Sequence, residues 1–501
     1  MRCDIDIRDG ELRYRGSVHG QDPAELAVTA SPTAFELTRL TPGAPALYYR
    51  LGRGRVQLSD DLRDLAPSGP LPPPDPGVLL AMIHGLPDAP GATPLPGVQE
   101  LTLGNRLRVD RDGVRVLRRP PQLAPGTSNL HHTLGRAIVQ DADELAVAYS
   151  GGVASSFVAV CARAAGRRPV LFHADLGGPS RPLPEIPDTR TERVRCDLTE
   201  LLDPDQITGR ELPAPLPESA LRRGMTGRLR AAAGMPLVSG ALLENLVSTT
   251  LPEVGGALWG RRLLACEPFH REGVLASLQV ARTVLAAKGA GMRGRRVIGV
   301  EPADSEAESQ EVGAAPQAPS EEGGLPGLTE AGREALKSAR LATGAVWRTH
   351  LEDLPTVFGR AEAARHEAGL TGASHAAGAV IPALDPRVLA AVAALPTRAL
   401  GRVRGGRFVN QAPLRDVLAR AGVGQIVEAS SAFRLRLAAA TYVHRERRAI
   451  AAQLAGDCAL ADLGLLDPAC VVRLLRDGQA TADRALIVLR LAWVDRWLRR
   501  R

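Results

Sequence analysis

The sequence predicts a mixed α/β protein, α+β overall, with a β-rich first part, a parallel α/β part and a helical C-terminal part. Three observations predict this order. Up to about residue 120, short runs alternate between apolar and polar residues, as half-buried strands do. After that, apolar strands alternate with helical segments, which is the pattern of a parallel sheet with crossover helices. From residue 385 on, apolar residues recur at helical spacing, which predicts helices.

The β-rich part is predicted to be a first domain over residues 1–120. Five alternating runs predict its strands: 11–16, 46–52, 55–62, 105–112 and 113–119. A proline-rich piece at 67–77 interrupts the domain, and a helix is predicted over 76–85.

The second predicted domain covers residues 121–501. Apolar strands are predicted at 144–152, 168–176 and 234–241, and the first and third run into glycine turns. Helices are predicted at 128–140, 153–166, 385–395, 412–422, 439–455, 468–478 and 480–500. Residues 302–328 are acidic and rich in proline and glycine, which predicts a disordered linker or a long surface loop.

Composition and charge exclude several classes of protein. Hydrophobic residues are 45% and charged residues 23% of the chain, so it has a core and is not disordered as a whole. The net charge is +7, but the arginines are interleaved with acids, so no basic face for nucleic acid is predicted. The six cysteines form no CxxC pair, and no apolar run reaches the length of a membrane span. We therefore expect a reduced, cytoplasmic protein without a structural zinc site or a membrane span.

The sharpest local signal is the turn Ser150-Gly151-Gly152-Val153-Ala154-Ser155-Ser156, which follows an apolar strand and precedes a helix. Two glycines allow backbone N–H groups to approach a phosphate, and the N-terminus of the helix adds a favourable field. The serine hydroxyls supply further donors. The turn therefore predicts phosphate contacts from Ser150, Gly151, Gly152, Ser155 and Ser156.

This turn resembles the pyrophosphate loop SGGxDS of the asparagine synthetase superfamily. The chain is most similar to the amide-forming branch that includes β-lactam synthetases and lasso-peptide macrolactam cyclases, and the resemblance extends over nearly its whole length. Further stretches that resemble lasso cyclases are LSDDLRDLA at 58–66, IHGLPDAPGATPLPGVQELTLGNRLRV at 83–109, IPALDPRVLAAVAALP at 381–396, PLRDVLARAGV at 413–423 and LADLGLLDPACVVRLL at 460–475.

The resemblance implies a glutaminase-like sandwich over 1–120 and an ATP-pyrophosphatase-type synthetase domain over 121–501. Such enzymes use ATP and Mg²⁺ to adenylate a carboxylate, which an amine then attacks to form an amide. A working glutaminase of this kind frees a cysteine as its first residue, whereas Cys3 follows Met1 and Arg2. We therefore expect a vestigial glutaminase domain and an amine that is already present on a peptide substrate.

The metal ligands of the family are only partly present. Ala154 stands where SGGxDS has its magnesium-binding Asp, and a methyl group provides no ligand oxygen. The second metal loop, SGxGxDEL, resembles residues 239–246, in which Glu244 takes the position of the metal Asp and Leu243 replaces a glycine. Glu244 is thus the surviving candidate ligand for Mg²⁺, although the helix dipole equally explains a glutamate at a helix start.

The family also places a lysine late in the synthetase domain, in a pattern like RxxKxxF. The matching segment has Phe433 at the aromatic position and Ser430 at the lysine position, and no lysine follows Lys337. Arg434 or Arg436 is the alternative cation, but a guanidinium has a different reach and stays protonated. The catalytic residues therefore stay unknown.

Three weaker candidates have ordinary alternatives. Asp175 ends the second strand, at the edge where open α/β sheets bind ligands, but it also suits a helix cap. His131 and His132 suit a helix surface, and Asp385 before Pro386 suits a helix cap.

Two functions stay open at this point. The first is an ATP-dependent ligase of peptide natural-product biosynthesis whose amide (macrolactam) formation is impaired. The second is a catalytically inactive pseudoenzyme that binds a precursor peptide or pairs with an active homologous synthetase. Ala154, Ser430 and the absence of C-terminal lysines favour the second function.

Overall fold

The structure of the protein is a computed structural model with a mixed α/β fold, α+β overall. It describes residues 2–499 outside the segments 9–10, 18–25, 45, 53–54, 67–73, 87–89, 120, 124, 127–128, 139–142, 177–181, 204–215, 249–324, 353, 355, 368–378, 405–406, 424–425, 427–430 and 479–481. The predicted linker at 302–328 lies outside the described residues except for its end. There Leu325 is buried and Leu328 forms a β-bridge with Leu466, so residues 325–328 are packed.

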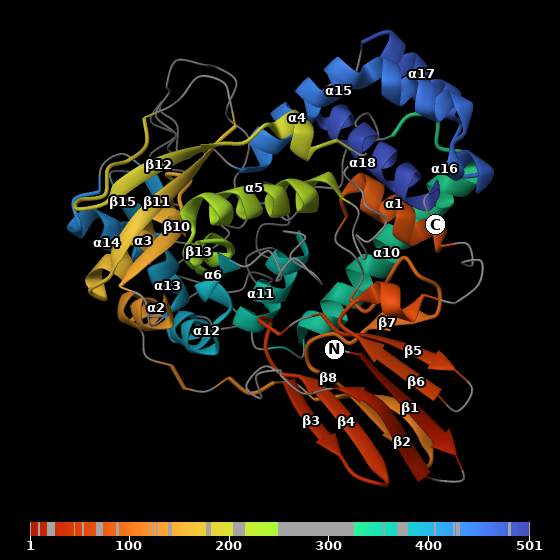
Figure 1. The fold of residues 1–501 in the computed structure, drawn as a ribbon, viewed down its shortest axis with the longest axis horizontal. Coiled ribbons are helices and arrows are strands. Elements are labelled where there is room, and N and C mark those ends of the chain that lie inside the picture. Colours follow the sequence, from red (N-terminus) through yellow and green to blue (C-terminus); the bar gives the residue numbers. More distant parts are fainter. Residues whose placement is uncertain are drawn as a thin grey trace, which may run out of the picture.

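Two antiparallel sheets form a sandwich near the N-terminus (Figure 1). The first has the order β2 (Glu11–Ser17), β1 (Arg2–Arg8), β6 (Arg55–Ser59), β5 (Tyr48–Gly52) and β7 (Val98–Glu100). The second has the order β3 (Leu26–Ala30), β4 (Ala34–Arg39), β8 (Asn105–Asp110) and β9 (Gly113–Arg118). One apolar cluster joins the facing sides, with Ile5 and Val56 from the first sheet and Leu37 and Leu107 from the second.

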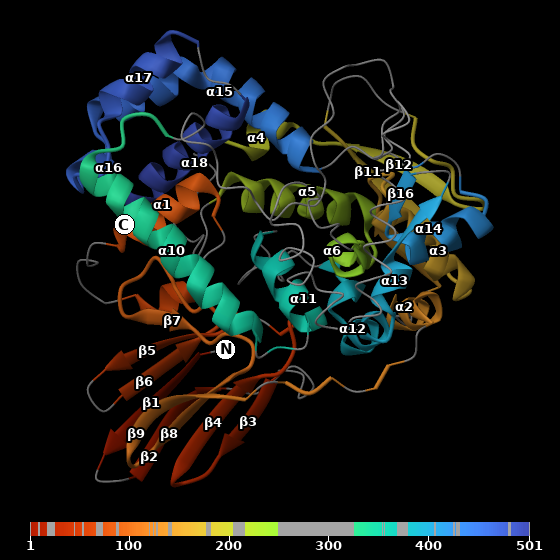
Figure 2. The same cartoon turned by 180° about the vertical axis from the view of Figure 1, so that it is seen from behind.

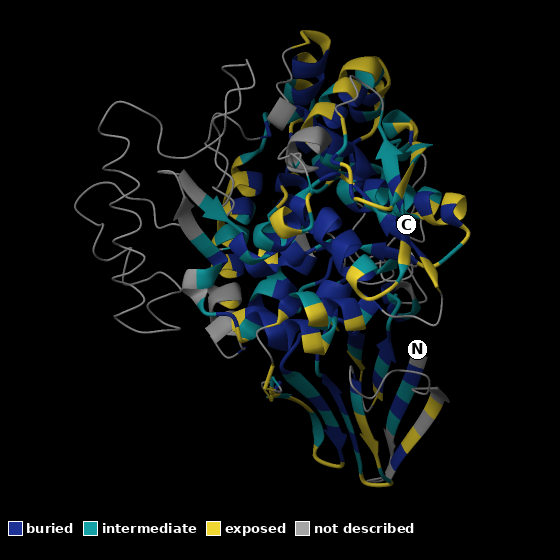
Figure 3. Ribbon diagram, turned by 90° about the vertical axis from the view of Figure 1, so that its left-hand side faces the viewer, coloured by how far each residue is buried: buried dark blue, intermediate teal, exposed yellow. Residues whose placement is uncertain are grey.

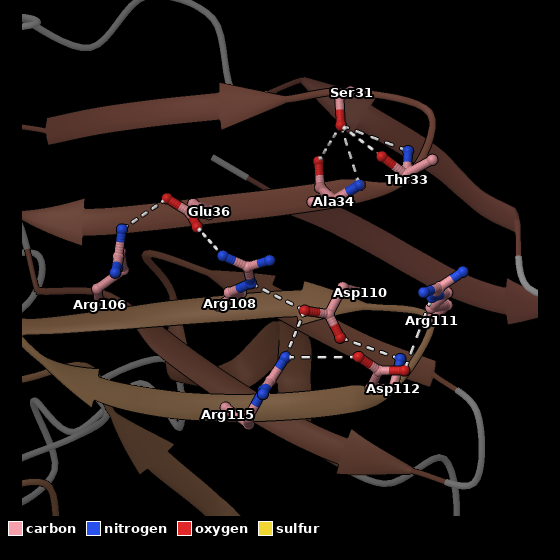
Figure 4. A network of polar contacts seen from close by, with 10 residues as sticks. All are labelled: Ser31, Thr33, Ala34, Glu36, Arg106, Arg108, Asp110, Arg111, Asp112 and Arg115. Atoms are coloured by element: carbon pink, nitrogen blue, oxygen red, sulfur yellow. Dashed lines mark hydrogen bonds and ion pairs between the residues drawn. The ribbon is translucent and has the colours of Figure 1, made fainter.

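Polar side chains cover the outer face of the second sheet (Figure 4). Glu36 accepts hydrogen bonds from Arg106 at 2.9 Å and from Arg108 at 3.0 Å, and Asp110 accepts from Arg108 and Arg115. These residues alternate along the strands with buried Leu37, Leu107 and Val109, as the pleat requires. The hydrogen bond from Arg108 is the main reason that the pKa of Asp110 is lowered to about 2.

A five-stranded sheet in which all strands are parallel follows the sandwich along the chain. Its order is β12 (Arg190–Arg195), β11 (Arg168–Asp175), β10 (Glu144–Ala148), β13 (Leu237–Ser239) and β14 (Ala379–Val380). Numbered along the chain this order is 3-2-1-4-5, so the strand order reverses between β10 and β13.

Helices cover both faces of the parallel sheet. One face packs in a large core against α2 (Leu130–Ile138), α3 (Val153–Ala164), α12 (Pro386–Ala393) and α14 (Ala412–Arg420). The other face packs against α5 (Pro217–Ala233), whose Leu229 and Ala233 contact Phe172 and Leu237 of the sheet. The smaller elements of this part of the chain are α4 (Leu198–Leu201), α6 (Leu243–Val247), α13 (Thr397–Leu400) and the hairpin of β15 (Gly401–Arg404) and β16 (Arg407–Asn410).

The C-terminal helices form a second core of their own. It contains α10 (Glu330–Glu352), α15 (Ser431–Gly456), α16 (Ala459–Asp462), α17 (Pro468–Arg476) and α18 (Ala482–Arg499), with Trp493 and Trp497 buried at its centre. Figure 3 shows buried residues gathered in the middle of the molecule, with exposed residues toward its outer edges and at the tips of the strands. No helix among the described residues is long and apolar enough to cross a membrane.

The predicted strands and helices are present, but one of them packs elsewhere than expected. The helix predicted at 76–85 is α1 (Pro76–His84), with Asp75 as its N-cap and Gly85 in a left-handed conformation at its C-terminus. Its Leu79, Leu80 and Ile83 are buried in the C-terminal helical core and not in the β-rich part (Figure 2). Residues 1–120 therefore contribute to the C-terminal helical core as well as to the sandwich, because α1 lies beside α10 and α18.

Candidate functional site

The predicted turn lies at the switch point of the parallel sheet. It follows β10, and the loop after β13 lies next to it, because β10 and β13 are adjacent parallel strands. Open α/β sheets bind ligands at the carboxyl ends of their strands at such a point. The two loops touch directly: a Cβ built on Gly240 would lie 2.8 Å from the carbonyl carbon of Ala154 and 2.9 Å from the nitrogen of Ser155. Only a glycine fits at position 240 without a shift of backbone.

The turn has two backbone features that anion-binding turns share. Gly151 has a φ of 77°, and Gly152 is the N-cap of α3 without any side-chain cap. The hydroxyl oxygens of Ser150 and Ser155 lie 3.1 Å apart, and the N–H of Gly152 donates to Ser150 Oγ at 3.3 Å. Two hydroxyls and several amides are therefore gathered within one turn of chain.

Most of the predicted phosphate contacts are not open to solvent. Ser150 is exposed and Gly152 is half-buried, whereas Gly151 is buried. Ser155 retains 5% of its surface and Ser156 none. A ligand that approaches this turn therefore meets Ser150 and Gly152 first, and Ser156 faces the protein interior.

Glu244 lies against the start of α3. Its Oε1 atom accepts the backbone N–H of Ala154 at 3.2 Å, across the switch point. The N-terminus of a helix carries a partial positive charge, so a carboxylate there is stabilised. Glu244 thus supplies to α3 the side-chain acceptor that Gly152 lacks, and the sequence comparison that placed it near the turn did not predict this bond.

Glu244 is in the first turn of a five-residue helix, α6, whose N-cap is Leu242, with a φ of 68°. We predicted that Leu243 replaces a glycine of the family loop, and this position is wrong by one residue. The residue in the left-handed conformation that suits glycine is Leu242, whereas Leu243 is in α6. A left-handed conformation costs about 1–2 kcal/mol for a residue with a Cβ. Burial of Leu242, which is 6% exposed, offsets this strain.

The residues at the turn do not fit magnesium. No group of three or more His, Cys, Asp or Glu that is able to hold a metal ion occurs among the described residues. Ala154 offers no ligand oxygen, and the nearby oxygen of Glu244 already accepts a backbone hydrogen bond. We therefore derive no reaction step through Mg²⁺.

The structure shows which contacts the three weaker candidates make. Asp385 is the N-cap of α12, since it accepts the N–H of Arg387 at 2.8 Å, and it also pairs with the Arg387 side chain. His131 packs edge-on against Phe157, and burial lowers its pKa. Asp175 ends β11, where its carbonyl accepts the N–H of Cys196 at 2.8 Å.

Cys3 is a core residue. It lies on β1 between β2 and β6, with 1% of its surface exposed. Burial, followed by the charge of Asp4, raises the pKa of its thiol, so the reactive thiolate is disfavoured. This supports the absence of a glutaminase nucleophile at this position.

The predicted lysine position cannot be placed. Ser430 and the side chains of Phe433 and Arg434 lie outside the described residues, and Arg436 is exposed on α15.

His173 is a polar residue near the site that the sequence did not single out. It lies on β11, and its Nδ1 is 2.9 Å from the carbonyl oxygen of Tyr149, the residue before the turn. The available signal was its place near the carboxyl end of a predicted strand, but neighbouring strands are needed to see which turn it contacts.

No protein-family model matches the chain, and no curated protein matches it. The family resemblance therefore stands on the quoted motifs alone.

Proposed function

We propose that this chain is an asparagine-synthetase-like, lasso-cyclase-like protein of peptide natural-product biosynthesis whose ATP-dependent amide formation is impaired. The proposal combines the SGGxxSS turn with its place at the switch point of a parallel sheet. The antiparallel sandwich that precedes the sheet is compatible with a glutaminase-like domain, and the buried Cys3 with a vestigial one. A glutaminase-like sandwich and an ATP-pyrophosphatase-type domain are the finer architecture that we propose.

The hydrogen bond between Glu244 and Ala154 is the observation that carries this proposal. The carboxylate lies at the N-terminus of α3, where a nucleotide phosphate would meet the same amide. Two anions at one amide repel each other, and no cation-binding group of the described residues lies there to neutralise them. ATP phosphates would contact the Ala154 amide only after Glu244 had moved away.

The same contact favours the pseudoenzyme over the slow enzyme. A missing metal ligand and a missing charge-stabilising lysine each remove transition-state stabilisation, and loss of one preorganised group typically costs ~10²–10³ in rate. The remaining function would be to bind a precursor peptide or to pair with an active synthetase. We propose a cytoplasmic location for this activity and no nucleic-acid partner.

The test is ATP–pyrophosphate exchange with candidate precursor peptides, combined with calorimetric titration of each peptide. We expect no exchange above the level of a Ser150→Ala control, and peptide binding whose affinity does not change when ATP and Mg²⁺ are added. Exchange that depends on Mg²⁺ and falls in the Ser150→Ala variant would establish an active ligase. The absence of both exchange and binding to peptides or to a co-expressed synthetase would refute both functions.

A further inference from the structure

Helix α6 is too short to be stable by itself. It has five residues, Leu243–Val247, and an isolated helix of this length is unstable in water. Its N-cap is in a strained left-handed conformation, and no side chain caps it. Because Glu244 is in the first turn of α6, the position of its carboxylate depends on what holds α6 from outside.

Arg360 holds the other end of α6. It belongs to α11 (Thr356–Glu367), and its Nη1 donates to the carbonyl oxygens of Leu246 at 3.3 Å and Ser248 at 3.0 Å. The last carbonyls of a helix have no partner within the helix, so these bonds satisfy groups that would otherwise need water. Arg360 is half-buried, and burial lowers the pKa of its guanidinium.

The apolar side of α11 reinforces this contact. Val357, Phe358 and Ala361 are buried in the same core as Leu243, Leu246 and Val247. The hydroxyl of Ser248 in turn donates to the carbonyl oxygen of Glu244, so the end of α6 is connected to its beginning. Two hydrogen bonds, both through Ser248, therefore connect Arg360 to the backbone of Glu244.

Helix α11 is itself anchored to the sandwich. Glu362 pairs with Arg39 of β4, with its two oxygens 2.9 and 3.2 Å from the guanidinium nitrogens, and Arg365 donates to Glu100 of β7 at 3.4 Å. Glu362, Arg365 and Arg39 have no exposed surface. These buried ion pairs fix α11 relative to both sheets of the sandwich, because a buried ion pair is costly to break.

We propose that Arg360 is a positioning residue that holds the carboxylate of Glu244 against the Ala154 amide. In this arrangement α11 determines the placement of Glu244, and α6 only carries it. The inference does not depend on the proposed function, because the contact that it concerns is within this chain.

The test is residue-resolved hydrogen exchange of the Ala154 amide in the full chain. Glu244→Ala removes the acceptor, and we expect it to accelerate Ala154 exchange about tenfold or more, the factor for a hydrogen bond to a charged group. Arg360→Met should accelerate the same amide by a similar factor. Arg333→Met is the control, since Arg333 also donates to a backbone carbonyl, that of Leu328 at 2.6 Å, but does so at the exposed start of α10. It should leave Ala154 exchange unchanged.

The double variant distinguishes positioning from general stabilisation. If Arg360 acts through Glu244, the double variant Glu244→Ala/Arg360→Met exchanges at Ala154 no faster than Glu244→Ala alone. Multiplied effects at Ala154, or an equal acceleration of amides in α18, would overturn the proposal. Should Arg360→Met fail to fold, Arg360→Lys keeps the charge and part of the reach. An intermediate acceleration at Ala154 alone would then support the proposal, whereas no acceleration at Ala154 would overturn it.

Discussion

Arg39 and Glu362 form a fully buried ion pair with two hydrogen bonds, although 323 residues separate them in the sequence. The pair joins β4 of the sandwich to α11. Arg365 and Glu100 complete a network of two positive and two negative side chains, and Arg365 also donates to the carbonyl of Ala44 at 3.2 Å. Opposite charges of equal number compensate each other here, so removal of one member leaves an uncompensated charge.

Arg39→Met should lower the free energy of unfolding by about 3–5 kcal/mol, because Glu362 and Glu100 would then share one guanidinium in a buried site. The measurement is urea unfolding followed by circular dichroism. Arg111→Met is the matched control, since Arg111 pairs with Asp112 at 3.8 Å and both side chains are mostly exposed. The control should change stability by less than about 0.5 kcal/mol. Equal effects of the two substitutions would show that the buried network is not important for stability.

Gly240→Ala should destabilise the protein by about 1–3 kcal/mol, because the added methyl would meet backbone atoms that have no rotamer to change. The atoms in its way belong to Ala154 and Ser155, so the change would push the two loops of the candidate site apart. Gly227→Ala in α5 is the control, since nothing lies within 4 Å of the added methyl there. It should stabilise by about 0.5–1 kcal/mol. Thermal unfolding of the pair measures both, and a neutral Gly240→Ala would contradict the close approach of the loops.

His84 should make the protein acid-sensitive. Its side chain is buried at the end of α1, and burial, followed by the charges of Arg340 and Arg490, lowers its pKa from 6.5 to about 4. The folded state therefore binds this proton less readily than the unfolded state, so the stabilisation is complete above pH 6.5 and is lost as the pH falls toward 4. A shift of this size corresponds to about 3 kcal/mol.

Substitution of His84 isolates this effect from other titrating groups. Neither ring nitrogen has a hydrogen-bond partner among the described residues, so His84→Leu removes two unsatisfied polar atoms and keeps the volume similar. We expect the variant to be at least as stable at pH 7 and to lose less stability than the wild type between pH 6.5 and 4. Parallel pH dependences in urea unfolding would show that His84 is not the cause.

The sequence was sufficient for elements whose signals are local. The strand–turn–helix at 144–166 and helix α1 were predicted from the pattern of apolar residues, and the turn also from its two glycines. The packing of α1 was not, because an apolar helix face does not specify which of two cores it enters. Residues far from α1 in the sequence decide which core the helix enters.

The charged residues of α11 show why the support of the candidate site was not visible in the sequence. Charged side chains are mostly exposed in proteins, so Glu362 and Arg365 suggest a solvated helix when their partners are unknown. Those partners, Arg39 and Glu100, lie in the sandwich, and no short motif connects them. Likewise, the position of Glu244 was predicted from a motif, but its bond to Ala154 depends on the pairing of β10 with β13.

Ala154→Asp provides the sharpest test of the missing metal ligand. The new carboxylate would lie near that of Glu244, and Ala154 is 7% exposed, so two partly buried like charges would repel each other. We expect the variant to be less stable than the wild type without divalent ions. Mg²⁺ in the millimolar range should restore stability, because a cation bound only by the folded state stabilises it by mass action.

Ala154→Asn is the matched control for this substitution, since it has the same shape without the charge, and Mg²⁺ should not change its stability. The wild type should also be unaffected. Pyrophosphate exchange should stay slow in the Ala154→Asp variant, because no lysine follows Lys337 to stabilise the developing charge. Thermal unfolding with and without Mg²⁺ measures the first effect, and exchange measures the second. If Mg²⁺ stabilised the wild type as strongly as the variant, a metal site would exist that does not involve position 154, and the proposed loss of metal binding would be wrong.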